Sequence, residues 1–251
     1  MRKPIIAANW KMNKGPAEAA EFVKNFKLEA SDLENVDVVI AAPFLDLPVL
    51  ANQAFAVAAQ NCSDKDSGAY TGETSVAMLK EVGVEYVLTG HSERRSLYGE
   101  DDAFINAKNC QLLDNGLKPI FCIGETLEER EGGQLEAVLK TQVTEGLKGI
   151  CNEGILNCVV AYEPVWAIGT GVTASPQQAQ EAHEIVRGLI ADLYTPELAA
   201  QVRIQYGGSM KPANADELLA LADIDGGLVG GASLDPESFL SLVKSAVNSV
   251  A

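Results

Sequence analysis

Short apolar runs recur along the chain, and each ends in glycine or a polar residue before a segment with helical spacing. Most of the runs are apolar throughout rather than alternating, which is typical of a parallel sheet covered by helices. The runs predict eight strands, with the ranges Ile5–Asn9, Val36–Ala42, Ala56–Gln60, Tyr86–Gly90, Pro119–Ile123, Cys158–Tyr162, Val202–Gly207 and Gly226–Gly230.

Helix boundary signals lie between these runs. Ser175-Pro176-Gln177-Gln178 has the pattern of a capping box with proline at the first helical position, and Asp235-Pro236 opens the last helical segment in the same way. Gly83 and Gly116 stand where helices are expected to end. The pattern therefore alternates strands with helices.

Eight strand–helix units in 251 residues predict an α/β protein, a (β/α)8 TIM barrel of eight parallel strands with outer helices. A doubly wound sheet is the alternative, but it would want G-x-G-x-x-G after the first strand, where this chain has "NWKMNKG". No linker or low-complexity tract interrupts the chain, so we expect one domain over residues 1–251.

The charge narrows the class of partner. The net charge of −16 predicts repulsion of nucleic acid and anionic membrane surfaces, so we expect neither as a partner. No apolar run approaches the roughly 18 residues that a membrane span requires. The same charge repels a phosphorylated metabolite at long range, so any anion site must be local, made by a lysine or by backbone N–H groups.

The five cysteines are odd in number and include no C-x-x-C pair, which predicts a reducing compartment rather than a disulfide framework. The basic N-terminus reaches Asn9 and Lys11 too soon for a signal peptide, so we expect a cytoplasmic protein. With two histidines in the chain, we expect no metal site.

Polar residues and paired glycines follow several of the predicted strands, and in a barrel the ends of all strands meet at one rim. They are Asn9, Lys11, His91, Glu163, Gly207, Gly208, Ser209, Gly230 and Gly231. Paired glycines let backbone approach a ligand closely, and exposed N–H groups bind phosphate. The rim is therefore the predicted site, with a phosphate subsite after the last two strands.

A glutamate, a histidine and a lysine suit proton abstraction beside a carbonyl group without any cofactor. Glu163 would take the proton, while His91 and Lys11 would stabilise the negative oxygen that develops. Taken singly, each has an ordinary alternative: an ion-paired acid, a core histidine and a solvated lysine. The second histidine, His183, lies inside an amphipathic helical segment, and we expect it at the surface.

The segment after Glu163 has the composition of a lid with two hinges. Pro164 stiffens its start, glycines loosen its far side, and apolar residues lie between. The lid residues are Pro164, Val165, Trp166, Ala167, Ile168, Gly169, Thr170, Gly171, Val172, Thr173 and Ala174. The alternative is an ordinary loop with Trp166 packed on the surface.

Six motifs in order, "NWKMN", "GHSERR", "CIGE", "AYEPVWAIGTG", "YGGS" and "LVGGASL", closely resemble those of the triosephosphate isomerase family from Asn9 to Leu234. The resemblance implies interconversion of dihydroxyacetone phosphate and D-glyceraldehyde 3-phosphate, a reaction of glycolysis and gluconeogenesis. It implies Glu163 as base, His91 as neutral electrophile and no cofactor.

The same resemblance assigns the remaining positions. Asn9 and Lys11 match substrate contacts, Ile168 and Leu228 an apolar clamp over the base, and Gly169, Ser209, Gly230 and Gly231 the phosphate-binding backbone. Cys122 and Glu125 match a cysteine behind the site and an acid near Lys11. Val172-Thr173-Ala174 matches the second hinge of the lid, a tripeptide that varies in the family, and we expect it to affect the rate of lid motion rather than the reaction.

The resemblance also implies a homodimer. "SGAYTGE", residues Ser67 to Glu73, matches a loop that enters the partner subunit, where Thr71 would meet the partner's site and Glu73 could pair with Arg94. Without the resemblance this stretch would be a solvated turn. Two other functions stay open, namely another phosphate-binding barrel isomerase and a catalytically silent barrel used for binding.

Overall fold

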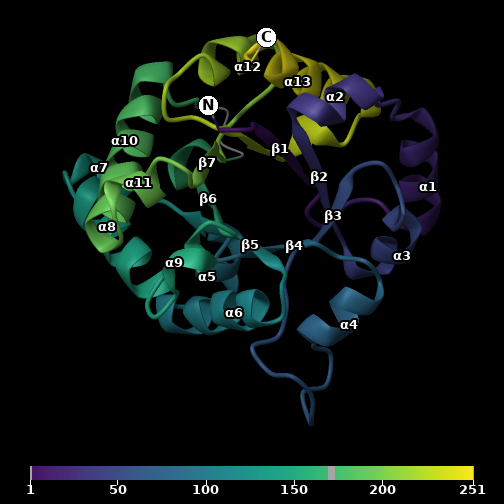
Figure 1. The fold of residues 1–251 in the computed structure, drawn as a ribbon, viewed down its shortest axis with the longest axis horizontal. Coiled ribbons are helices and arrows are strands. Elements are labelled where there is room, and N and C mark those ends of the chain that lie inside the picture. The colour runs from purple at the N-terminus through teal and green to yellow at the C-terminus, as the bar shows by residue number, and fades with distance from the viewer. Residues whose placement is uncertain (1, 169–172, 251) are drawn as a thin grey trace.

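The chain forms a closed barrel of parallel strands in sequential order, with β1 paired to both β2 and β8 (Figure 1). The structure is a computed structural model that describes residues 2–168 and 173–250. The strands are β1 (Ile5–Asn9), β2 (Asp37–Ala42), β3 (Ala56–Ala59), β4 (Tyr86–Thr89), β5 (Lys118–Ile123), β6 (Val159–Tyr162), β7 (Arg203–Tyr206) and β8 (Gly226–Val229). The predicted (β/α)8 architecture is confirmed, and every predicted strand boundary lies within one residue of the observed one.

Helices surround the barrel as an outer ring (Figure 1). Short 3₁₀ turns occur at η1 (Phe44–Asp46), η2 (Val165–Ala167) and η3 (Gly231–Ser233). The helices are α1 (Pro16–Asn25), α2 (Ala30–Asn35), α3 (Leu47–Leu50), α4 (Val76–Glu81), α5 (Ser92–Tyr98), α6 (Asp102–Asp114), α7 (Leu127–Glu131), α8 (Leu135–Gly146), α9 (Asn152–Ile155), α10 (Pro176–Leu193), α11 (Pro196–Ala199), α12 (Pro212–Leu219) and α13 (Pro236–Asn248).

Most residues of the strands are apolar because both faces of each strand are covered. Alternate side chains point to opposite faces of a strand. Ile5 and Ala7 of β1 belong to the cluster inside the barrel, whereas Ile6 and Ala8 belong to the cluster between strands and helices. The barrel interior is thus a packed core, which leaves the strand ends as the place for a site.

The predicted helix boundary signals are present. Ser175 Oγ accepts the N–H of Gln178 at 3.2 Å, and Asp235 Oδ1 accepts the N–H of Ser238 at 2.8 Å. Gly83 and Gly116 follow α4 and α6 with φ of 82° and 77°, a left-handed conformation that favours glycine. These local signals fix where α4, α6, α10 and α13 begin or end.

The prediction that His183 lies at the surface is wrong, because its exposed fraction is 0%. On α10 it shares the inward stripe with Ala179, Val186 and Ile190, which follow the spacing of one helix face. The helix presents this stripe to the barrel, so the imidazole is enclosed between α10 and the strands.

The segment between β3 and α4 projects beyond the ring of helices (Figure 1). It contains the predicted interface loop, where Gly68 and Gly72 have φ of 129° and 96° and Tyr70 is 47% exposed.

Among residues 2–168 and 173–250, no helix is long and apolar enough to cross a membrane.

Candidate active site

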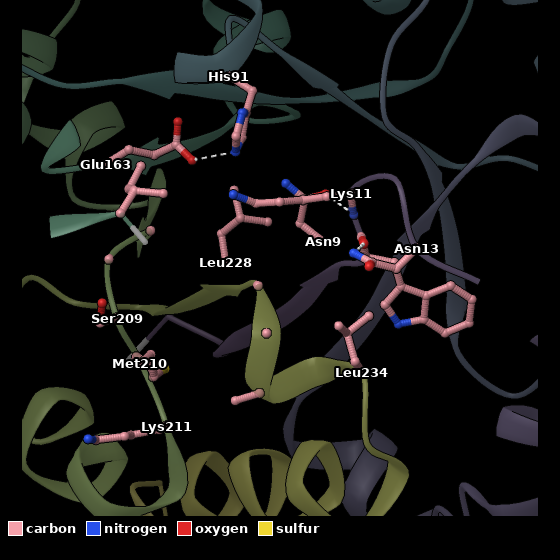
Figure 2. Close-up of a pocket in the computed structure, with 17 residues that line it drawn as sticks. Asn9, Lys11, Asn13, His91, Glu163, Ser209, Met210, Lys211, Leu228 and Leu234 are labelled. Carbon is pink, nitrogen blue, oxygen red and sulfur yellow. Dashed lines mark hydrogen bonds and ion pairs between the residues drawn. The ribbon is translucent and has the colours of Figure 1, made fainter. Parts of the chain in front are cut away.

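A cavity of about 490 Å³ opens at the rim formed by the carboxyl ends of the strands (Figure 2). It lies where barrels of this architecture place their chemistry. Residues from the ends of five strands and the loops after them line it, namely Asn9, Trp10, Lys11, Asn13, His91, Glu163, Ile168, Gly207, Gly208, Ser209, Met210, Lys211, Leu228, Gly230, Gly231, Ala232 and Leu234. The structure thus brings the described residues of the predicted site together.

Glu163 follows β6 directly and is held in a defined position. Its backbone N–H donates to the carbonyl of Ile123 at 2.7 Å, which continues the β5–β6 ladder. One carboxylate oxygen accepts the N–H of Ser92 at 3.0 Å, and the other lies 3.1 Å from Nε2 of His91. Burial raises the pKa of Glu163, but His91 and the Ser92 amide lower it by more, so the carboxylate is ionised.

His91 caps α5, and this sets the position of its proton. Its Nδ1 accepts the backbone N–H of Glu93 at 3.2 Å, so the neutral ring carries its proton on Nε2, facing Glu163. Burial lowers the pKa of His91, but the Glu163 carboxylate raises it by more, and the pKa lies above its usual value. That rise depends on Glu163 remaining beside the ring.

Lys11 reaches the cavity from the turn after β1. Its φ of 54° is rare for a residue with a side chain, and the turn is held by Asn9 Oδ1, which accepts the Lys11 N–H at 3.0 Å. The Lys11 Nζ atom lies 2.6 Å from Oε1 of Glu93. A Cβ placed on Gly230 would lie 3.7 Å from Cε of Lys11, so the lysine stem runs beside that glycine.

The expectation that Glu125 lies near Lys11 is wrong, since the acid that contacts Lys11 is Glu93. Glu125 is fully buried beneath the first part of the predicted lid. It accepts hydrogen bonds from Tyr162 Oη at 3.0 Å, Trp166 Nε1 at 2.8 Å and Arg130 Nη1 at 3.0 Å. Glu125 therefore ties the end of β6 to η2. Cys122, as expected, is buried behind the site.

The turns after β7 and β8 line the cavity together with Glu163, and Ser209 marks the β7 turn (Figure 2). A Cβ on Gly207 would lie 2.7 Å from Cγ of Glu163, and one on Gly208 would lie 2.1 Å from Oη of Tyr206. Both positions therefore exclude a side chain. The Ser209 hydroxyl donates to the carbonyl of Ala167 at 2.8 Å, which joins the β7 turn to η2.

The predicted lid is described at both of its ends. Pro164 to Ile168 leave β6 through η2, and Ile168 and Leu228 line the same cavity as Glu163. Their role as an apolar clamp over the base stays a prediction. Thr173 is exposed, whereas Ala174 is 4% exposed next to the start of α10. The expectations for Gly169, Thr170, Gly171 and Val172 lie outside the described residues.

A second cavity of about 300 Å³ borders the first and shares Asn9, Lys11 and His91 with it. Its outer wall carries exposed apolar side chains, with Met12 at 97% and Tyr98 at 69% exposure. Nε of Arg94 donates to Oε1 of Glu100 of the same chain at 2.6 Å. Arg94 therefore already has an acidic partner, and the predicted contact with Glu73 would be a second one.

Thr71 and Glu73 lie in the projecting loop rather than in either cavity. Their predicted contacts are with a second copy of the chain, and they stay a prediction. Within residues 2–168 and 173–250, no group of three or more histidine, cysteine, aspartate or glutamate side chains is arranged to hold a metal ion.

Comparison with known proteins decides the family, because the triosephosphate isomerase family model matches residues 4–246. The chain belongs to the triosephosphate isomerase family. It is 54% identical over 247 residues to a triosephosphate isomerase of Ligilactobacillus salivarius, covering 97% of this chain and 98% of that protein. The protein of the same name from Carboxydothermus hydrogenoformans is 53% identical over 251 residues, covering 98% and 100%. That of Latilactobacillus sakei is 53% identical over 247 residues, covering 97% and 98%.

Proposed function

We propose that this member of the triosephosphate isomerase family interconverts D-glyceraldehyde 3-phosphate and dihydroxyacetone phosphate, without a cofactor, through an enediolate. The convergence of Glu163, His91 and Lys11 on one cavity that two glycine turns also line carries the proposal. This arrangement supplies a base, two donors and an anion-binding wall to a ligand of triose size.

Glu163 acts as the base. Its carboxylate removes a proton from the carbon next to the carbonyl group, and the electron pair of that C–H bond forms the enediolate double bond. The protonated Glu163 then returns a proton to the neighbouring carbon, and the enediolate double bond becomes the new carbonyl bond. The proton of the remaining hydroxyl passes through His91 to the oxygen that carried the negative charge, which completes the isomerisation. In the resting site both carboxylate oxygens are engaged by Ser92 and His91, so the base leaves these partners to reach the substrate.

His91 and Lys11 stabilise the oxygen that becomes negative. The Nε2–H of His91 points into the cavity because Nδ1 is occupied by the Glu93 amide. When Glu163 moves to the substrate, the largest contribution that raises the pKa of His91 weakens. Burial, the largest contribution of all, and Lys11 continue to lower this pKa, against the smaller rise from Glu93. The imidazole is therefore a neutral donor during the reaction. Asn9, 5% exposed beside Lys11, orients the same end of the substrate.

The glycine turns bind the phosphate group. Gly208, Ser209, Gly230 and Gly231 line the cavity, and backbone N–H groups in such turns bind phosphate through several short hydrogen bonds. Gly169 is proposed as a further phosphate contact. Local donors of this kind are needed because the net charge of −16 repels the substrate at a distance.

The segment from Pro164 to Ala174 closes over the bound substrate. Closure would exclude water, which makes the carboxylate more basic and protects the enediolate from loss of phosphate. The contacts of Trp166 with Glu125 and of Ser209 with Ala167 link this segment to β5 and β7. Closing therefore has to rearrange bonds on both sides of the cavity.

The chain works as a homodimer in which the projecting loop of one copy enters the second cavity of the other. The loop extends from the barrel with Tyr70 exposed, and the second cavity offers exposed Met12, Phe44 and Tyr98 beside Lys11. Thr71 would then approach Asn9 and Lys11 of the other copy. Such a contact buries apolar surface that single soluble chains rarely expose in one patch.

We also propose that residues 1–251 act as a single domain, supported by the pairing of β1 with β8. Five free thiols support a cytoplasmic location. We expect neither nucleic acid nor a membrane as a partner, since the net charge disfavours both.

The test of the reaction is steady-state isomerisation of D-glyceraldehyde 3-phosphate by the purified protein, coupled to NADH oxidation through glycerol-phosphate dehydrogenase. We expect kcat/KM near the diffusional ceiling of about 10⁸ to 10⁹ M⁻¹s⁻¹. No turnover by the folded protein would contradict the proposal. Turnover of another phosphorylated sugar would then favour a different barrel isomerase, and binding without turnover a silent barrel.

The dimer is tested by sedimentation of the purified protein and of Met12→Asp, which places a charge on the most exposed apolar side chain of the second cavity. We expect Met12→Asp to be monomeric and at least tenfold slower. Leu127→Asp is the matched control, because Leu127 is exposed on α7 outside this cavity. A monomeric and fully active parent protein would overturn the proposal.

A further inference from the structure

His183 is enclosed by two tyrosines that the proposed reaction does not use. Its ring meets that of Tyr162 edge-on, with centroids 5.5 Å apart at 80°, and that of Tyr206 at 6.1 Å and 39°. All three side chains are at most 1% exposed. Nδ1 of His183 lies 2.7 Å from the carbonyl of Ala179, one turn earlier on α10, so the ring is fixed to its helix.

The two tyrosines are the last residues of adjacent strands. Tyr162 ends β6 and Tyr206 ends β7, and the next residues are Glu163 and Gly207. The N–H of Gly207 donates to the carbonyl of Tyr162 at 2.7 Å, which joins the two strand ends. A single imidazole thus supports both strands at the point where they release the chain into the site.

Both of these strand ends lead to the carboxylate of Glu163. Tyr162 precedes it in the chain, and Gly207 lies so close that an added Cβ would be 2.7 Å from Cγ of Glu163. The far end of the Tyr162 ring is fixed as well, since its hydroxyl donates to Glu125 at 3.0 Å. His183 and Glu125 therefore hold Tyr162 from two sides.

We propose that His183 is a positioning residue for Glu163, whose ring sets the spacing of Tyr162 and Tyr206 and thereby the place of the carboxylate beside His91. The expected effect of His183 on the reaction rate rests on the proposed function. The expected effect of His183 on the resting position of Glu163 does not. The contacts of the His183 ring with the two tyrosine rings set this position. An aromatic replacement of His183 should therefore preserve the position of the Glu163 carboxylate, and an aliphatic or amide replacement should not.

The resting position can be read from His91, because the nearby carboxylate raises the pKa of that histidine. The chain has two histidines, so in any variant of His183 the imidazole signals in an NMR titration belong to His91 alone. We expect the His91 pKa to fall in His183→Gln, whose amide can still donate to the Ala179 carbonyl but which lacks a ring. In His183→Phe we expect it to stay within about 0.3 of the parent value.

Kinetics supply the second measurement. Displacement of a reacting group by about 1 Å can cost roughly a hundredfold in rate. We expect His183→Gln to lower kcat by about tenfold to a hundredfold with a smaller change in KM, and His183→Phe to retain kcat within about threefold. If the parent protein has no isomerase activity, the proposed function fails while the NMR titration still tests the position of Glu163.

The matched control is Val186→Ala, a truncation of another fully buried side chain one turn along α10. It should lower Tm without changing the His91 pKa or kcat. A His183→Gln protein that loses Tm but keeps the parent His91 pKa and kcat would overturn the proposal. Equal losses of kcat and of the His91 pKa in His183→Phe and His183→Gln would overturn the role of the ring contact.

Discussion

Nζ of Lys11 and Oε1 of Glu93 lie 2.6 Å apart, across 82 positions of sequence. Glu93 is also the residue whose N–H holds Nδ1 of His91. Glu93 therefore orients both groups that are proposed to stabilise the enediolate. Its side chain contacts Lys11, and its backbone N–H contacts His91.

Glu93→Gln should lower kcat/KM by about tenfold, because Lys11 loses its charged partner, while Tm changes little. Both side chains are partly exposed, and ion pairs of this kind contribute roughly 0 to 1 kcal/mol to stability. Glu145→Gln is the control, since it breaks an exposed ion pair with Lys148, and neither of these residues lines the cavities beside Lys11. An unchanged kcat/KM in Glu93→Gln would show that Lys11 needs no such partner.

Glu163→Asp should lower kcat about a hundredfold or more while the fold is kept. The shorter side chain withdraws the carboxylate by about one methylene from the reacting carbon. The measurement is kcat under substrate saturation, with circular dichroism to confirm the fold. A folded Glu163→Asp protein with the parent rate would exclude Glu163 as the base.

Glu163→Gln should lower the pKa of His91. Burial alone lowers this pKa, and the carboxylate of Glu163 is the main group that raises it, so removing that charge leaves burial to dominate. The shift is measured by NMR titration of the imidazole signals. Glu197→Gln, on α11, is the control and should leave the titration unchanged. A His91 pKa that is equal or higher in Glu163→Gln would contradict the assigned contact.

Stability should fall in acid because of His183. Burial lowers its pKa to about 4 in the folded protein, whereas an unfolded chain has the ordinary value of about 6.5. Between these two pKa values the imidazole of His183 is protonated in the unfolded chain but neutral in the folded protein. The stability that depends on this neutral side chain is therefore complete above about pH 6.5 and is lost as the pH falls toward 4. Its size is on the order of 3 kcal/mol.

The measurement is the free energy of unfolding by denaturant between pH 4 and pH 7.5, for the parent and for His183→Gln. We expect a smaller loss of stability across this interval in the variant, by about that amount. Identical slopes for the two proteins would mean that His183 titrates normally in the folded state.

The strands could be predicted from sequence because a strand covered on both faces is a short apolar run with a clear end. Glu163, His91 and Lys11 could be brought to one rim for the same reason, since parallel strands of a barrel all end on one side. The turns that we propose bind phosphate could be placed from the glycine pairs at those strand ends. This part of the fold and site depends on local pattern and on one rule of topology.

The prediction for His183 fails because a polar residue in an amphipathic helix far from any strand end is expected on the outer face. The helical spacing of residues 179, 183, 186 and 190, which places them on one buried face of α10, indicates the location of His183 better than its polarity does. The expectation of Glu125 near Lys11 fails for a different reason. The pairing of Lys11 with Glu93 joins β1 to α5, and no local pattern in sequence reports which acid of several a distant lysine meets.

The pairing of β1 with β8 means that the last strand of the barrel completes the first. While a ribosome is still adding residues before Gly226, β1 lacks that neighbour and presents an unpaired parallel edge, which is prone to aggregate. The turn with Gly230 and Gly231 is also missing at that stage. Each nascent chain therefore lacks both the strand that closes the barrel and one wall of the cavity until β8 and the turn after it have been synthesised.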